Sequence, residues 1–169
     1  MNATCIECNM EKPVKEFYEN RTAPLKVTAR CRECTDNIKS GLTRTIKGVY
    51  VLHFERPVVY EDAWKYGDST GGHYIGSSSD IQWRIWNHRQ GEGSGMTKAA
   101  LAQGINFKLA GVFPGYAVEM EMALIRAGAK NICTHCLVEN DEMLKAHIEA
   151  KENGVKWDKN EWLEKRRSQ

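Results

Sequence analysis

Two short runs in the middle of the chain carry the apolar and aromatic alternation of β-strands, over residues 47–54 and 72–76. The run over 77–80 offers helix-capping side chains ahead of a predicted helix over 81–89. A further helix is predicted over 117–127, where strong helix formers end at a glycine. The order of strand, strand, helix, intervening strand and helix predicts an α+β fold, in which helices flank a small antiparallel or mixed β-sheet.

The C-terminal part of the chain carries a separate helical pattern. Residues 140–153 form a helix candidate closed by Gly154, with Leu144 and Ile148 on one side. We expect Trp157 and Trp162 to anchor a last turn back onto the body. A helical extension is therefore predicted over 139–169.

Two cysteine pairs, Cys5/Cys8 and Cys31/Cys34, lie 22 residues apart near the N-terminus. A tetrahedral zinc ion takes four such thiolates, and too few apolar residues lie between the pairs to form a core without a metal. The spacing predicts a structural zinc ribbon over residues 1–40. Two disulfides or a redox dithiol are the alternatives.

A third pair, Cys133 and Cys136, follows the predicted helix over 117–127. Together with His135 or His147, these two thiolates could bind a second zinc, but the sequence offers no obvious fourth ligand. Reduced, buried cysteines are the alternative interpretation, and the pair could also reinforce a turn.

Composition narrows the class of protein. Hydrophobic residues make up 41% and charged residues 27% of 169 residues, which excludes wholesale disorder, and no apolar run is long enough to span a membrane. The first residues lack the pattern of a secretory signal, so we expect a cytoplasmic protein of a bacterial host, where cysteines serve as metal ligands.

The paired strands resemble those of the GIY-YIG nuclease superfamily. Gly48-Val49-Tyr50 and Tyr74-Ile75-Gly76 correspond to its two tripeptides, and the resemblance spans about 85 residues within a predicted domain over 46–138. The N-terminal pairs also resemble zinc ribbons that precede catalytic domains in phage-type endonucleases. The other matching residues are Arg84 and His88, at offsets of 10 and 14 from Tyr74, then Glu121, and Asn131 ten residues later.

This resemblance implies roles that phosphodiester hydrolysis requires. Glu121 would be the sole protein ligand of a catalytic Mg²⁺ or Mn²⁺, and Arg84 would grip the scissile phosphate. Tyr50 would orient or deprotonate the attacking water, which requires nearby positive charge because a free tyrosine has a pKa near 10. Tyr74 and His88 would position the water and the phosphate.

Asn131 would tie the helix of the glutamate to the sheet.

Two features depart from the family. Tyr50 and Tyr74 are separated by 23 residues, where the family has about ten, and Ser77 stands where many relatives carry lysine. Aromatic residues of the inserted stretch 55–71 would stack on bases or cover the core. The glycine-rich segment 91–98 fails the phosphate-loop pattern and is interpreted as a mobile loop near the substrate.

These patterns predict a metal-dependent DNA endonuclease, a site-selective nickase or homing-type enzyme of phage or mobile-element character. A monomer is favoured, and because a monomer with one active site most simply makes one cut, nicking is the default. The formal charge of +2 falls to about zero once four thiolates hold one zinc, so DNA binding must come from local contacts. The alternative is a non-catalytic nucleic-acid-binding or adaptor protein on an inactive nuclease fold.

Overall fold

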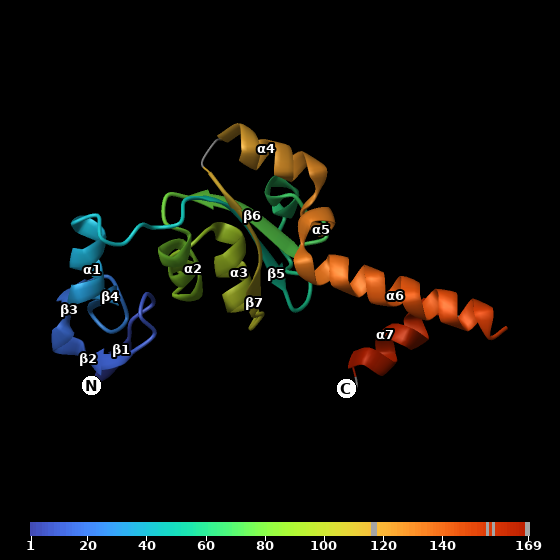
Figure 1. Ribbon diagram of the computed structural model, residues 1–169, viewed down its shortest axis with the longest axis horizontal. Helices are drawn as coiled ribbons and strands as arrows, with labels where there is room; N and C mark the ends of the chain where they lie inside the picture. Colours follow the sequence, from blue (N-terminus) through green and yellow to red (C-terminus); the bar gives the residue numbers. More distant parts are fainter. Residues whose placement is uncertain (116–117, 155, 157, 168–169) are drawn as a thin grey trace.

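The protein is an α+β molecule, as the sequence predicted, and its strands form three small antiparallel sheets (Figure 1). The computed structural model describes residues 1–115, 118–154, 156 and 158–167. Ala117, in the stretch with the nuclease resemblance, and Trp157, the expected anchor, lie outside these residues.

The N-terminal module consists of two β-hairpins and a helix. Its small core packs Ala3 and Phe17 against Cys5 and Cys31. Since this core is so small, the module needs a further constraint to remain folded. Its elements are β1 (Asn2–Thr4), β2 (Glu11–Pro13), the 3-10 helix η1 (Val14–Glu16), β3 (Phe17–Glu19), β4 (Val27–Cys31) and α1 (Arg32–Lys39).

The central domain is built on a three-stranded antiparallel sheet with the strand order β6-β5-β7. Strand β5 (Gly48–Phe54) lies in the middle, β6 (His73–Ser78) on one side, and β7 (Phe107–Pro114) on the other. The register places Tyr50 opposite Gly76. Because successive side chains of a strand point to opposite faces, Tyr50 and its neighbour Val51 face different layers.

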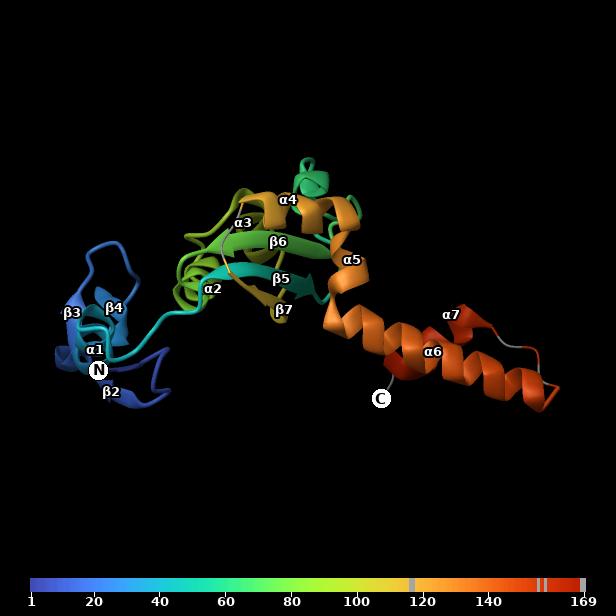
Figure 2. The ribbon, with the colours of Figure 1, turned by 45° about the horizontal axis from the view of Figure 1, so that its top comes forward.

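Helices cover both faces of this sheet (Figures 1 and 2). On the face of Tyr50, helices α2 (Ile81–Arg89) and α3 (Gly95–Ala102) pack over one buried cluster. On the face of Val51, helix α4 (Val118–Ala127) and the elements after it pack over a second cluster. Helix α3 corrects the sequence interpretation, which placed a mobile loop over 91–98.

The chain then continues into two helices that extend from the domain (Figures 1 and 2). Helix α5 (Ala129–Ile132) leads into α6 (Thr134–Glu152). Earlier in the chain, the 3-10 helix η2 (Ala63–Tyr66) lies in the inserted stretch between β5 and β6. Helix α6 begins six residues before the predicted start at 140, and α7 (Lys159–Arg167) follows it. No helix of the described residues is long and apolar enough to cross a membrane.

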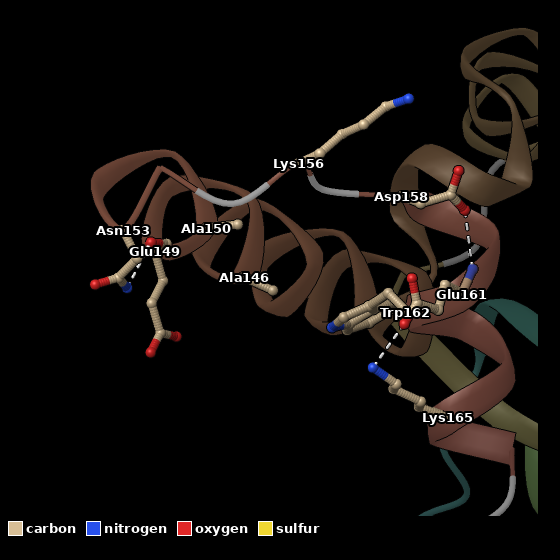
Figure 3. Close-up of a pocket in the computed structure, with 9 residues that line it drawn as sticks. All are labelled: Ala146, Glu149, Ala150, Asn153, Lys156, Asp158, Glu161, Trp162 and Lys165. Atoms are coloured by element: carbon tan, nitrogen blue, oxygen red, sulfur yellow. Dashed lines mark hydrogen bonds and ion pairs between the residues drawn. The ribbon is translucent and has the colours of Figure 1, made fainter.

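A pocket between α6 and α7 is lined mostly by polar and charged side chains (Figure 3). It lies at the opposite end of the molecule from the N-terminal module. Lys165 pairs with Glu161 inside it, and Trp162 forms one wall.

Arg30 joins the N-terminal module to the central domain. Its Nε lies 2.8 Å from a carboxylate oxygen of Glu7, and its Nη1 and Nη2 lie 2.6 and 2.9 Å from the two oxygens of Asp80. Asp80 also caps α2 by accepting a hydrogen bond from the backbone N–H of Trp83. The module is therefore fastened to the N-terminus of the helix that carries Arg84 and His88.

Candidate functional site

The hydroxyls of Tyr50 and Tyr74 converge above Gly76. A Cβ atom at position 76 would lie 2.8 Å from the Tyr50 hydroxyl oxygen and 2.9 Å from that of Tyr74, closer than such atoms approach. The two tyrosine rings lie 6.1 Å apart between centroids. The absence of a side chain at Gly76 therefore makes room for both hydroxyls over strand β6.

His88 joins this group from helix α2 and is fully buried. Its Nε2 lies 2.6 Å from the Tyr50 hydroxyl, and its Nδ1 lies 2.7 Å from Oγ1 of Thr97. Because the Thr97 hydroxyl donates to the Ser94 carbonyl at 3.0 Å, its oxygen is left to accept a hydrogen bond from Nδ1–H of His88. The Ser94 backbone N–H also lies 3.4 Å from Nδ1, a contact that favours the opposite tautomer. Because the Thr97 contact is much shorter, we assign the proton to Nδ1, so that Nε2 accepts from the Tyr50 hydroxyl.

The electrostatics of the pair favour a neutral histidine and a neutral tyrosine. Burial, with a smaller contribution from the charge of Arg84, lowers the pKa of His88 to about 4. Burial and the neighbouring Tyr74 raise the pKa of Tyr50, while the charge and hydrogen bonding of Arg84 act in the opposite direction. The positive charge that a tyrosine base requires is present, but burial outweighs it.

Thr97 and Gly93 are parts of this site that sequence reasoning missed. Thr97 is fully buried behind His88, and a Cβ atom at Gly93 would collide with the His88 ring. The segment was interpreted as a loop because of its three glycines. Ser94, whose side chain caps α3 by accepting from the Thr97 N–H, was the signal for a helix there.

Glu121 lies on the other face of strand β6. Ser77 Oγ donates to Glu121 Oε2 at 2.5 Å, and Ser77 points away from the face that holds Tyr74 and Gly76. In the described residues, no contact joins Glu121 directly to Arg84 or His88. Ser77, the departure from the family pattern, is thus the partner of the expected metal ligand.

Asn131 holds a position different from the expected one. Its side chain is exposed, and its Nδ2 donates to the carbonyl of Ala127 at 2.7 Å. This bond joins the start of α5 to the last residue of α4. It acts within the helical segment, whereas we expected a tie from the helix of Glu121 to the sheet.

The inserted stretch 55–71 covers the aromatic site. Tyr66 packs on Tyr74 with ring centroids 4.8 Å apart, and Tyr60 lies against the same buried cluster. Trp64, by contrast, is 61% exposed. Two of the three aromatic residues therefore cover the core, and Trp64 is the one free to stack on a base.

The four N-terminal cysteines gather into one group that could hold a metal ion. All four thiols are free, and their sulfur atoms lie within 4.8 Å of one another. Burial raises the pKa of Cys5, but backbone N–H groups of Cys31, Cys8 and Glu7 outweigh burial and lower it to about 7. A set of four converging thiolates is the ligand set of a structural zinc site.

A second group that could hold a metal combines Cys133 and Cys136 with His53 and His73. This corrects the expected partners of the cysteine pair. His135 is exposed, with its ring centroid 5.4 Å from that of His53, and it is not part of the group. The side chain of His147 lies outside the described residues.

Comparison with known proteins finds no family model, no curated protein and no solved structure that matches this chain. The geometry of the Tyr50–His88–Thr97 group and of the two metal-binding groups is therefore the basis for assigning a function.

Proposed function

We propose that the chain is a metal-dependent DNA endonuclease of the GIY-YIG type, which hydrolyses phosphodiester bonds. One observation carries the proposal: the Tyr50 hydroxyl is hydrogen-bonded at 2.6 Å to a buried, neutral His88. A neutral imidazole that accepts from a tyrosine hydroxyl can take up that proton as a general base.

Tyr50 and His88 act together in the proposed water activation. The attacking water gives a proton to the Tyr50 oxygen while the tyrosine proton moves to Nε2 of His88. The water oxygen forms a bond to phosphorus, the bond from phosphorus to the leaving oxygen breaks, and solvent protonates the leaving oxygen. This relay avoids a free phenolate, which the raised pKa of Tyr50 makes unfavourable.

Thr97 has a positioning role in this scheme. By accepting from Nδ1–H of His88 at 2.7 Å, it keeps Nε2 unprotonated and directed at Tyr50. The imidazolium that forms during the reaction would still donate through Nδ1. The arrangement follows the logic of a histidine base oriented by a third group.

Arg84 is the group proposed to bind the scissile phosphate. Its guanidinium acts on both Tyr50 and His88, and its side chain is only partly buried. Because the Tyr50 hydroxyl is closed off from solvent, a substrate must move a neighbouring side chain to reach it. An arginine drawn outward by the phosphate opens that path and forms the planar two-point contact for which its fork is suited.

The catalytic cation would be held by Glu121. Its carboxylate and the neighbouring Ser77 hydroxyl are the hard oxygen ligands that Mg²⁺ prefers, so the donor set fits. Among the described residues, Glu121 is not part of a group of three or more potential metal ligands, so the proposed ion would take most of its ligands from water. When bound, the ion would offset negative charge on the phosphoryl oxygens.

Strand β6 would give the proposed substrate access both to Arg84 on one face of the sheet and to Glu121 on the other. As an edge strand, it leaves Gly76 and Ser77 near the rim of the sheet, with α2 on one face and α4 on the other. A phosphate lying along this edge would meet Arg84 from one side and Glu121 from the other.

The test is cleavage of supercoiled plasmid by the full chain with Mg²⁺ and with chelator. We expect nicked product with Mg²⁺ alone, and at least a 100-fold loss of rate in Glu121→Ala. Glu119→Ala, an exposed glutamate on the same helix, is the matched control and should cut normally. Arg84→Ala should lose activity, and Arg84→Lys should recover only part of it.

Three outcomes of these assays would contradict the proposal. Failure of the wild-type chain to cut any DNA would favour a nucleic-acid-binding adaptor instead. A wild-type rate in Glu121→Ala would contradict the metal assignment, and full activity in Arg84→Lys would contradict the two-point contact.

A further inference from the structure

We propose that His53, His73, Cys133 and Cys136 form a second structural zinc site, inside the central domain. The ligand atoms of these four residues lie within 4.8 Å of one another. Three of the residues are at most 5% exposed, and His53 is partly buried. Polar side chains that converge on one buried point need a partner, and a metal ion is the partner that all four can share.

The distances match a tetrahedral site. His53 Nδ1 lies 3.0 Å from His73 Nε2, and Cys136 Sγ lies 3.1 Å from the same Nε2. The sulfur atoms of Cys133 and Cys136 lie 3.5 and 3.7 Å from His53 Nδ1. Zinc with bonds of about 2.0–2.3 Å places its ligand atoms about 3.3–3.8 Å apart, so a small expansion of this group accommodates the ion.

The register of the sheet creates the histidine half of the site. His53 of β5 and His73 of β6 are directly opposed, on the face that packs against α5 and α6. Cys133 lies between α5 and α6, and Cys136 lies in the first turn of α6. The backbone N–H of Cys136 also donates to Cys133 Sγ at 3.4 Å.

Asp68 supplies the outer support that a zinc-binding histidine requires. Its Oδ2 lies 2.5 Å from His73 Nδ1, and its other oxygen accepts from the N–H and hydroxyl of Thr70. This contact holds the His73 proton on Nδ1 and leaves Nε2 free to coordinate. Asp68 belongs to the inserted stretch 55–71, so the insertion contributes to this site.

The ligand set and its burial favour zinc over redox chemistry. Two thiolates and two imidazoles form a closed four-ligand set, which is typical of structural zinc and leaves no position for a substrate. A redox dithiol would have to expose one sulfur to a partner, but Cys133 is 0% and Cys136 5% exposed.

The site would connect the two halves of the proposed active site. Its histidines lie on the strands that carry Tyr50 and Tyr74, and its cysteines follow the helix that carries Glu121. A zinc ion here fixes the helical layer on the sheet.

Zinc content of the full chain tests the proposal without depending on DNA cleavage. We expect two zinc ions per wild-type chain by elemental analysis. The pair Cys133→Ser/Cys136→Ser should bind one, and so should Cys5→Ser/Cys8→Ser, since each removes a different site. His135→Ala, a histidine beside the group but outside it, is the matched control and should keep two.

Asp68→Asn keeps all four ligands and covers the case in which the double serine variant fails to fold. It should weaken one of the two zinc sites by about 10–100-fold in competition with a chelator. Cobalt replacement should give thiolate-to-metal absorption from six thiolates in the wild type. A single zinc in the wild type, two retained in Cys133→Ser/Cys136→Ser, or unchanged affinity in Asp68→Asn would overturn the second site.

Discussion

The Tyr50 hydroxyl and the His88 imidazole are both buried and lie 2.6 Å apart. Burial disfavours the charged form of each side chain, so both are neutral near pH 7. A proton can therefore pass from one to the other only when a third group supplies or removes charge. In the proposed reaction, the attacking water and the phosphate do so.

The pH dependence of cleavage separates this relay from a free tyrosine base. His88 must be neutral to accept a proton, and its pKa is lowered to about 4. The cleavage rate should therefore rise as pH increases through about 4 and level off between about pH 5.5 and 8. A phenolate base with a raised pKa would instead give a rate that increases about tenfold per pH unit through pH 7–9. Single-turnover cleavage rates across this range decide between them.

Thr97 offers a second test at the level of one residue. Thr97→Val keeps the shape of the side chain but leaves Nδ1 of the buried His88 without an acceptor, at a cost of about 1–3 kcal/mol. We expect cleavage to slow by about 10–100-fold. Thr97→Ser, which keeps the hydroxyl, should stay within a few-fold of the wild type. Equal rates for the two variants would show that Thr97 only fills space.

Helix α2 is the element on which the proposed site depends most. It carries Arg84 and His88, and its N-terminus is held by Asp80, which in turn binds Arg30 of the N-terminal module. The module is thus coupled to the orientation of helix α2 through one guanidinium. Arg30 side-chain exposure is 9%, so little water competes for this contact.

Arg30→Ala should therefore destabilise the protein, by about 2 kcal/mol, because Glu7 and Asp80 lose their shared partner. This loss of unfolding free energy is smaller than that expected for a fully buried ion pair, because the Asp80 side chain is 20% exposed. Denaturant unfolding measures it, with zinc content expected to be unchanged. Lys65→Ala, which breaks an exposed pair with Asp62, should cost less than about 1 kcal/mol. Equal losses would contradict a structural joint at Arg30.

Local sequence patterns predicted the main elements of the central domain, but not the two histidines of the proposed second zinc site. Strands β5 and β6 and helices α2 and α4 lie within a few residues of the predicted ranges, because alternation and capping are local signals. His53 and His73 meet only through strand register, which brings together residues 20 positions apart. Helix α3 was missed because the glycines before it outweighed the Ser94 cap.

At the scale of the whole molecule, charge is nearly balanced, with 24 basic and 22 acidic residues. The proposed N-terminal zinc site lowers the net charge to about zero, and a second site with two thiolates and one ion leaves it there. General attraction to DNA would therefore be weak, and under the proposed function binding would rely on Arg84, the proposed cation and a few lysines.

This balance predicts a weak dependence of DNA binding on salt. A plot of log binding constant against log salt concentration should have a slope no steeper than about −3, from about three phosphate contacts. Fluorescence anisotropy with a labelled duplex, with Ca²⁺ in place of Mg²⁺ to prevent cutting, measures it. A slope of about −6 or steeper would reveal a basic surface that the near-neutral charge does not suggest.

The most direct test of the central claim is the rate at which Tyr50→Phe nicks supercoiled plasmid with Mg²⁺ at pH 7.5. This change removes one oxygen atom from a fully buried ring and leaves the packing around it in place. We predict that the wild type converts plasmid to open circles and that Tyr50→Phe is at least about 100-fold slower, with the same zinc content. An inactive wild type, or a variant that cuts at the wild-type rate, would contradict the claim that the Tyr50–His88 pair activates the attacking water.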